Sequence, residues 1–250
     1  MTANKSIYFA SDFHLGVPDE ASSLIREKLI CDWLEMARQN ASEIYLLGDV
    51  FDFWFEYKQV IPKGFSRFFG KICEITDSGI PVTFFKGNHD MWTFGYLEKE
   101  LGVKVISDEL IIERNNKKIF LHHGDGLGPG DTAYKWIRKL FRSQFGIALF
   151  GFLHPRLGAG LAQYLSRSSR IQNKGTDKIF KGEDKEYIVL FCKEILKTQH
   201  FDYFICGHRH LPLNIDLGNN SRYINLGEWV NDFTYAEMNG TEIELKVFKP

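Results

Sequence analysis

The sequence predicts an α/β domain with a parallel sheet whose strands end in polar side chains. Apolar runs alternate with stretches of helical periodicity over residues 6–90, which is typical of βαβ units around a buried sheet. Five apolar runs end in clusters of Asp, His, Asn and Gly. The 250 residues are 44% apolar and 25% charged, which excludes a disordered chain, a collagen-like repeat and a coiled coil.

The first part of the chain supplies the alternating units. They are the strands 6–11, 43–49 and 81–90 and the helices 20–39 and 63–78. The apolar face predicted for the first helix comprises Leu24, Leu29, Trp33 and Met36. Gly79 and Pro81 end the second helix, because neither residue continues a helix well.

Antiparallel strands are expected in the second part of the chain. Residues 103–122 predict two strands joined at Asn115-Asn116, and a helix over 182–199 precedes a strand within 203–210. The C-terminal segment predicts hairpins, with a type I′ turn at Asn239-Gly240. We therefore expect one domain over residues 1–250, with residues 127–180 inserted in it as a helical cap.

The cysteines and the N-terminal residues indicate in which cellular compartment the protein is expected. Cys31, Cys73, Cys192 and Cys206 form no C-x-x-C pair, so we expect buried, reduced thiols. The N-terminus lacks a basic segment followed by an apolar one, and the longest apolar run, 145–153, is shorter than the roughly 18 residues that a membrane span needs. We expect a cytoplasmic protein, either free or peripheral on the cytoplasmic face of the inner membrane.

The five polar clusters are expected to converge at one edge of the sheet. They lie at 12–14, 48–49, 87–90, 122–125 and 207–210. The carboxyl ends of parallel strands share an edge, and ligands bind there. Asp, His and Asn form an oxygen and nitrogen shell that suits Mn²⁺, Fe²⁺ or Zn²⁺ better than Ca²⁺, and the absence of thiolate argues against structural zinc.

The clusters contain more candidate ligands than one catalytic metal takes from a protein. The seven are Asp12, His14, Asp49, Asn88, His123, His208 and His210. A carboxylate can bridge two ions, and Asp49 is the natural bridge. Two ions about 3.5–4 Å apart form a clamp for in-line attack on phosphorus and activate water. Each residue alone is equally typical of a turn, a helix cap or a buried histidine, so the prediction depends on their combination.

The order D-x-H, G-D, G-N-H-D, H-G-D and G-H-x-H resembles the motif set of the calcineurin-like metallophosphoesterases. The resemblance implies a two-sheet β sandwich flanked by helices. It also implies one metal held by Asp12, His14, Asp49 and His210, and a second held by Asp49, Asn88, His123 and His208. The family's catalytic histidine matches His89, and Asp90 is expected to orient its imidazole.

Further motifs are similar to one branch, the UDP-2,3-diacylglucosamine pyrophosphatases of lipid A synthesis. They are ASDFHLG at 10–16, LLGDVFDFWF at 46–55 and HGDGL at 123–127. This resemblance implies water attack on the α-phosphorus, giving UMP and 2,3-diacylglucosamine 1-phosphate, with two divalent ions and Mn²⁺ preferred. The implied substrate contacts are Asp131, Tyr134, Ser169, Asn173 and Lys178. His89 is a departure, because well-studied members of this branch carry Arg there.

The inserted segment discriminates between substrates. Residues 131–181 carry ten Lys and Arg against two Asp, a charge of +8 in a chain of net charge −1. With many bulky apolar residues between the bases, this composition predicts contact with an anionic membrane surface or binding of an anionic amphiphile. The resemblance to the branch implies that this amphiphile is a nucleotide-linked lipid substrate. The alternative is an ordinary cap whose apolar side chains pack on the sheet. The continuous apolar run disfavours nucleic acid, and the oligomeric state is not predicted.

Two other functions remain open at this point. One is a phosphodiesterase or phosphatase acting on a soluble ester. The other is a metallophosphoesterase-like scaffold without catalysis, which would be expected to lack ligands or the catalytic histidine; all eight positions are present.

Overall fold

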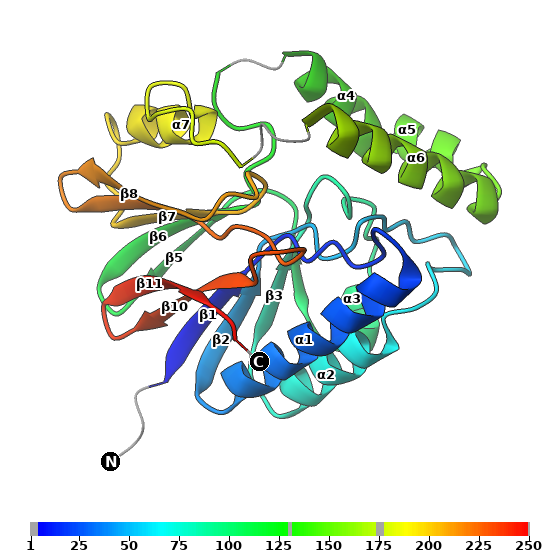
Figure 1. The fold of residues 1–250 in the computed structure, drawn as a ribbon, viewed down its shortest axis with the longest axis horizontal. Helices are drawn as coiled ribbons and strands as arrows, with labels where there is room; N and C mark the ends of the chain where they lie inside the picture. The colour runs from blue at the N-terminus through cyan, green and yellow to red at the C-terminus, as the bar shows by residue number, and fades with distance from the viewer. Residues whose placement is uncertain (1–4, 130–131, 174–177, 250) are drawn as a thin grey trace.

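Two mixed β-sheets lie face to face, with helices on both outer faces and three further helices over one end (Figure 1). The computed structural model describes residues 5–129, 132–173 and 178–249. This arrangement confirms the predicted fold class, a helix-flanked sandwich of two sheets.

The first sheet contains the strands of the predicted βαβ units. Its order is β11-β10-β1-β2-β3-β4, with β1 to β4 parallel and with β10 antiparallel to both β1 and β11. The bounds are β1 Ser6–Ala10, β2 Ala41–Leu46, β3 Val82–Phe85, β4 Lys104–Ile106, β10 Thr234–Asn239 and β11 Glu242–Val247. Its helices are α1 Glu20–Arg38, α2 Ser66–Asp77 and α3 Tyr96–Leu101.

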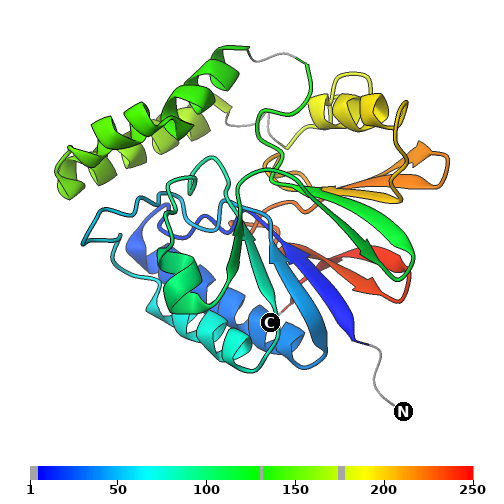
Figure 2. The same ribbon diagram turned by 180° about the vertical axis from the view of Figure 1, so that it is seen from behind.

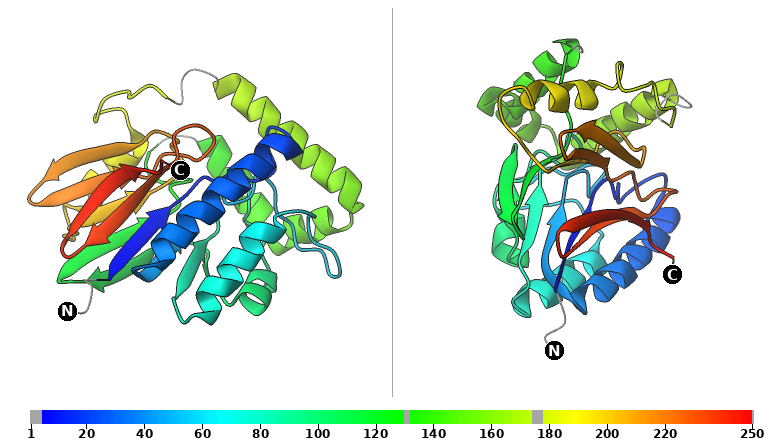
Figure 3. Two further views of the ribbon diagram at one scale, coloured as in Figure 1. Left: turned by 60° about the horizontal axis from the view of Figure 1, so that its bottom comes forward. Right: turned by 90° about the vertical axis from the view of Figure 1, so that its left-hand side faces the viewer.

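The second sheet has the order β5-β6-β7-β9-β8. The strands β6, β7 and β9 are parallel, and β5 and β8 are antiparallel edge strands. Its elements are β5 Leu110–Arg114, β6 Lys117–His122, β7 Tyr203–Cys206, β8 Leu213–Gly218, β9 Ser221–Asn225 and the covering helix α7 Tyr187–Ile195. Parallel strands in both sheets therefore place their carboxyl ends at the same end of the sandwich (Figure 3).

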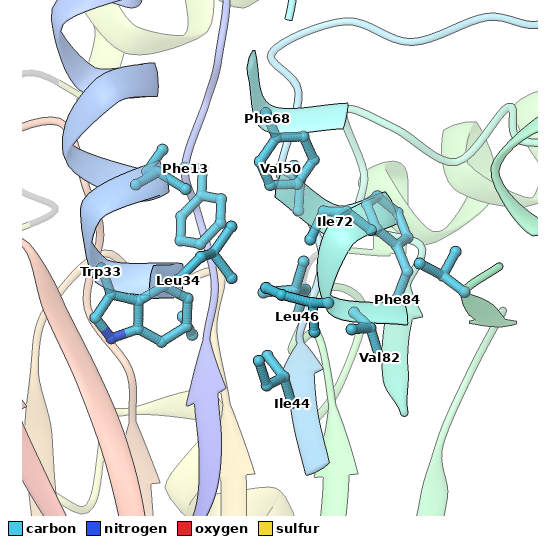
Figure 4. Packing of buried hydrophobic residues seen from close by; sticks show 14 of the residues in the cluster. Phe13, Trp33, Leu34, Ile44, Leu46, Val50, Phe68, Ile72, Val82 and Phe84 are labelled. Carbon is cyan, nitrogen blue, oxygen red and sulfur yellow. The ribbon is translucent and has the colours of Figure 1, made fainter. Parts of the chain in front are cut away.

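Alternating side chains divide the apolar core into layers. On β1, Tyr8 and Ala10 face α1 and α2, whereas Ile7 and Phe9 face the second sheet, as the period of two in a strand requires. Figure 4 shows Trp33 and Phe68, from the two helices, packing toward the first sheet. A third cluster fills the space between the second sheet and α7.

Two local predictions need correction. The buried face of α1 is Ile30, Trp33, Leu34 and Ala37, whereas Leu24 is exposed. The last hairpin pairs Asn239 with Glu242, so Gly240 is the first loop residue and takes positive φ in place of Asn239. The expected type I′ turn is therefore wrong, and it occurs instead at Asn115-Asn116, where both residues have positive φ.

Two elements and two thiols also differ from expectation. The short helix α3 was not predicted, because six residues are too few for a periodic pattern. Residues 103–122, expected as strands, form three of them, because β4 is separate from β5 and belongs to the other sheet. All four cysteines are free, but only Cys192 and Cys206 are buried, and Cys31 and Cys73 are half-buried.

The cap consists of α4 Thr132–Arg142, α5 Gln144–Gly151 and α6 Pro155–Asn173. The three helices lie over the end of the sandwich at which β1, β2 and β3 finish (Figures 1 and 2). They fall within the predicted insertion 127–180. The chain leaves the second sheet after β6 and returns to it through α7 and β7.

Candidate metal centre and the cap above it

Loops that follow five strands bring the predicted ligand residues together at one end of the sandwich. Asp12 and His14 follow β1, Asp49 follows β2, and Asn88 follows β3. His123 directly follows β6, and His208 and His210 follow β7. The loops are tied to one another: the Asp12 amide donates to the Gly48 carbonyl at 3.0 Å, and the Gly207 amide donates to the His123 carbonyl at 2.8 Å.

The first group of ligand atoms comes from Asp12, His14, Asp49 and His210. One side-chain atom from each lies within 4.8 Å of the others. His14 Nε2 is 3.0 Å from His210 Nε2, and Asp12 Oδ1 is 3.1 Å from His210 Nε2. This is the group expected to hold the first ion, and its role as a ligand set remains a prediction.

The second group shares Asp49 with the first. Ligand atoms of Asp49, His123 and His208 lie within 4.8 Å of one another. His123 Nε2 is 3.3 Å from Asp49 Oδ2 and 3.2 Å from Asn88 Oδ1. Because Asp49 Oδ2 is also 4.0 Å from His14 Nε2, one carboxylate oxygen lies between the two groups, where a bridging ligand is needed.

The backbone at the site is held in an unusual conformation. Asp12, His14, Asp49, His208 and His210 have φ values between 45° and 67°, a region that side chains other than Gly seldom adopt. Such conformations persist only where the surrounding structure enforces them, and they concentrate at functional sites. At Gly87 a Cβ would overlap the Asp49 carboxylate, so the close approach of these two loops requires glycine.

Hydrogen bonds away from the cluster orient two of the imidazoles. His123 Nδ1 lies 2.7 Å from the Leu47 carbonyl oxygen, which can only accept, so Nδ1 carries the proton. His14 Nδ1 faces Asp52 Oδ1 at 3.3 Å. In both rings Nε2 is therefore directed into the cluster, as metal-binding histidines require.

Two buried oxygens test whether the residues fit a pair of cations. Asp12 Oδ1 and Asp49 Oδ2 have almost no exposure and, within the described residues, accept no hydrogen bond of good geometry. Buried carboxylate oxygens without a partner are costly. A cation at each group would satisfy them, and the Asp, His and Asn donor set suits Mn²⁺, Fe²⁺ or Zn²⁺, so the residues fit the metal pair.

The charges of the cluster are mutually dependent. Burial raises the pKa of Asp49, but the neighbouring His123 and other histidines outweigh this effect and hold the pKa well below its usual range. Burial lowers the pKa of His123, but the Asp49 carboxylate raises it by more, so the pKa is about 10. Burial lowers the pKa of His208 to about 4. The carboxylates are thus ionised and ready to bind cations at neutral pH.

His89 lies at the open side of the cluster, and Asp90 does not orient it. The His89 imidazole is partly exposed, and its centroid is 5.0 Å from that of His14. Asp90 is buried and accepts from the amides of Gly87 at 2.7 Å and Val50 at 2.8 Å. The expectation for Asp90 is therefore wrong: its carboxylate joins the loops after β2 and β3, and the Asp52 carbonyl holds His89 Nδ1 at 2.9 Å.

The cap is joined to the loops of the metal cluster by polar contacts. Arg138 of α4 binds the buried carboxylate of Asp125 at 2.5 Å, two residues beyond His123. Ser166 of α6 donates to Asp52 Oδ2 at 2.9 Å. Ser166 was not predicted, because a lone serine in a helix has no sequence signal for a contact 114 residues away.

Aromatic side chains form the apolar part of the same junction. Phe150 of α5 lies 4.4 Å from Trp92 and 4.9 Å from Phe55, measured between ring centroids. Trp92 Nε1 also donates to the Phe141 carbonyl at 2.8 Å. In the loop after β2, Phe55 packs against the cap, and Trp54 is buried among core rings.

Most other bulky apolar side chains of the cap are exposed instead of packing on the sheet. Phe152 is 89% exposed, Trp136 72% and Phe145 71%. The others are Ile137, Leu140, Leu149, Leu153, Leu157 and Leu161. Within the described residues no single helix qualifies as a membrane span; α5 with residues 155–162 passes the length and composition test only as a pair bent by 118°.

Most of the predicted substrate contacts fall on residues or side chains that the structure does not describe. Asp131 lies outside the described residues, as do the side chains of Tyr134, Ser169 and Asn173. Lys178 is described: its ammonium binds Glu228 at 3.0 Å and Asp232 at 2.7 Å.

The segment after the cap is attached to the site by a residue that sequence reasoning missed. Arg209, between two predicted ligands, binds Glu186 at 3.0 Å and the Ile179 carbonyl at 2.7 Å.

The chain is similar to proteins of known name. The sequence is 37% identical over 253 residues to a UDP-2,3-diacylglucosamine hydrolase from Porphyromonas gingivalis, with 96% of each chain covered. It is 26% identical over 245 residues to the protein of that name from Proteus mirabilis, covering 96% of this chain and 98% of the relative. Among solved structures, the phosphoesterase Yfce from E. coli is 14% identical, with a TM-score of 0.47 over 97% of this chain and 92% of that chain.

The family assignment follows from the match to a family model. The sequence model described as calcineurin-like phosphoesterase covers residues 5–212, which include every predicted metal ligand. The resemblance inferred from the five motifs is thereby confirmed. Calcineurin-like phosphoesterases use a dinuclear site of divalent metals, and this chain, with its two ligand groups around Asp49, belongs to that family and is a metal-dependent phosphohydrolase.

Proposed function

We propose that the protein hydrolyses the pyrophosphate of UDP-2,3-diacylglucosamine in lipid A synthesis, giving UMP and 2,3-diacylglucosamine 1-phosphate. The observation that carries the proposal is the position of a basic cap with exposed apolar side chains directly over a phosphohydrolase site. The relatives named UDP-2,3-diacylglucosamine hydrolase match almost the whole chain, cap included.

In this proposal Asp12, His14, Asp49 and His210 hold one divalent ion, and Asp49, Asn88, His123 and His208 hold the other. We propose Mn²⁺ as the native metal. Two such ions supply Lewis acidity and lower the pKa of water. The protein holds the ligands on strand ends, and Asp90 keeps the loops after β2 and β3 in register through its backbone hydrogen bonds.

His89 acts on the leaving group. Its Nδ1 proton is held by the Asp52 carbonyl, so Nε2 is the nitrogen that remains for substrate. His89 donates a hydrogen bond from Nε2 to the oxygen that bridges the two phosphorus atoms. Water adds to the uridine-side phosphorus, the bond from this phosphorus to the bridging oxygen breaks, and the lipid phosphate leaves.

The cap selects the lipid. A hollow of about 520 Å³ lies between α1, the loop before α2, and α6, and it reaches Asp52. Its apolar lining includes Leu24, Phe53, Phe65 and Ala159, and its size is in the range of ligand pockets. The exposed apolar and basic residues of α4 to α6 face an anionic membrane surface on its cytoplasmic side.

We also propose that residues 127–180 form one inserted cap in a single domain.

The proposal is tested with synthetic UDP-2,3-diacylglucosamine, Mn²⁺ and mixed micelles in ¹⁸O-labelled water. We expect UMP to be released and to carry the label, because water attacks the α-phosphorus. Label in the lipid phosphate would contradict the stated position of attack.

Absence of UMP at high enzyme concentration, with hydrolysis of bis(p-nitrophenyl) phosphate intact, would contradict the lipid substrate. It would favour a soluble phosphate ester instead. A chelator should stop both reactions.

A further inference from the structure

One buried carboxylate, that of Asp52, lies between the metal cluster and the cap. Asp52 is 4% exposed and lies in the same loop as the proposed bridging residue Asp49, the loop that follows β2. Its amide donates to the Leu15 carbonyl at 2.9 Å, which fixes this loop to the one that carries His14. Of its two carboxylate oxygens, one faces the metal cluster and the other faces the cap.

The oxygen Oδ1 faces the metal cluster. It is 3.3 Å from His14 Nδ1, and it lies on the side of the ring away from the proposed metal. A carboxylate at this position keeps the proton on Nδ1, leaves the Nε2 lone pair for the cation and makes the imidazole a stronger donor. His89 Nδ1 is 3.7 Å from the same oxygen, in addition to its hydrogen bond with the Asp52 carbonyl.

The oxygen Oδ2 faces the cap. It accepts the hydroxyl hydrogen of Ser166 at 2.9 Å, and Ser166 is 6% exposed, so water competes little for this hydrogen bond. A hydrogen bond to a charged group is stronger than one between neutral groups, and it is stronger again where water is excluded. The contact therefore fixes the position of α6 relative to the loop after β2. Through Asp52, this loop contacts the imidazoles of His14 and His89.

We infer that Asp52 is a positioning residue that couples the seating of α6 to the binding of metal at His14. The inference builds on the metal site of the proposed function and is independent of the lipid substrate. When Ser166 holds Oδ2, the carboxylate presents Oδ1 to His14 in one orientation. By linkage, metal bound at His14 must in turn favour the seated position of α6 by the same factor.

The first test is a Mn²⁺ titration of the chelator-treated protein. We expect Asp52→Ala to weaken Mn²⁺ binding by about 10–100-fold, the range for loss of a carboxylate behind a metal-bound histidine. Asp52→Asn keeps an oxygen that accepts from Nδ1, so it should restore part of the affinity. Wild-type affinity in Asp52→Ala would overturn the inference, and thermal unfolding of the metal-free variants checks that they fold.

The second test is hydrogen exchange of α6 with and without Mn²⁺. In the wild type we expect Mn²⁺ to slow the exchange of α6 amides, and in Ser166→Ala this effect should disappear. Tyr164→Phe is the matched control: it removes a hydroxyl from an exposed ring of the same helix, and it should respond to Mn²⁺ as the wild type does. If wild-type α6 exchanges equally with and without Mn²⁺, the coupling does not exist.

These measurements separate the inference from the proposed function. Neither uses the lipid, so failure to release UMP leaves the Mn²⁺ results unaffected. Conversely, an enzyme that hydrolyses UDP-2,3-diacylglucosamine while α6 ignores Mn²⁺ would retain the proposed function and refute the coupling.

Discussion

The metal cluster and the cap are built in opposite ways. Asp12, Asp49 and His123 are at most 1% exposed and are held by backbone hydrogen bonds between strand-end loops, whereas Phe152, at the tip of the cap, is 89% exposed. A site that performs chemistry needs fixed donors, and a surface that accepts a lipid needs accessible apolar area. The difference teaches that reaction and substrate selection depend on different side chains. The exposed cap residues can therefore be altered without the metal ligands, whereas Ser166 joins α6 to the cluster through Asp52.

The largest effect is expected at the residue shared by both ligand groups. Asp49→Ala should abolish phosphohydrolase activity and the binding of both ions, because it removes a ligand from each group. Metal content and turnover of bis(p-nitrophenyl) phosphate measure the two losses. As a control, His200→Ala removes an exposed side chain far from the cluster and should change neither. Retained activity in Asp49→Ala would contradict the bridging role.

A smaller loss is expected where the side chain acts on substrate without binding metal. His89→Ala should lower kcat by about 10²–10⁴-fold with both ions still bound, since only proton donation is lost. His89→Arg keeps a cationic donor and should retain more activity than the alanine variant. Loss of metal in His89→Ala would instead make His89 a ligand.

The charge state of the cluster predicts how metal binding depends on pH. Because the pKa of His123 is raised to about 10, the ring is protonated at neutral pH before metal binds, and each ion bound there must displace that proton. Raising the pH removes this competition, so Mn²⁺ affinity should increase about tenfold per unit over roughly pH 6.5–8.5. Calorimetry in two buffers of different ionisation enthalpy would measure how many protons are released when Mn²⁺ binds. An affinity that does not change with pH would contradict the displacement of a proton from His123.

The smallest effect should be confined to lipid turnover. Phe145→Asp with Phe152→Asp places charges on exposed cap positions, so we expect about a tenfold lower rate on micellar UDP-2,3-diacylglucosamine. Hydrolysis of bis(p-nitrophenyl) phosphate should be unchanged. Equal losses on both substrates would show that the cap and the cluster are not separable in the way proposed.

The sequence was informative where the site depends on residue type and strand order. The grouping of Asp49 with His14 could be anticipated because the parallel strands β1 and β2 end at one edge of their sheet. His123 follows β6 of the second sheet, so its place beside Asp49 depends on how the two sheets face each other. The role of Asp90 could not, because a carboxylate that accepts backbone amides has the same sequence pattern as one that orients an imidazole. The Ser166 contact depends on how α6 docks, and the period of a helix does not encode its docking partner.

The central claim is that side chains distant in sequence hold a pair of divalent ions around Asp49. Anomalous diffraction from crystals soaked in Mn²⁺ tests it most directly. We predict two peaks about 3.5–4 Å apart, one in each ligand group, with the Asp49 carboxylate between them. A single peak, or manganese bound away from these side chains, would contradict the claim.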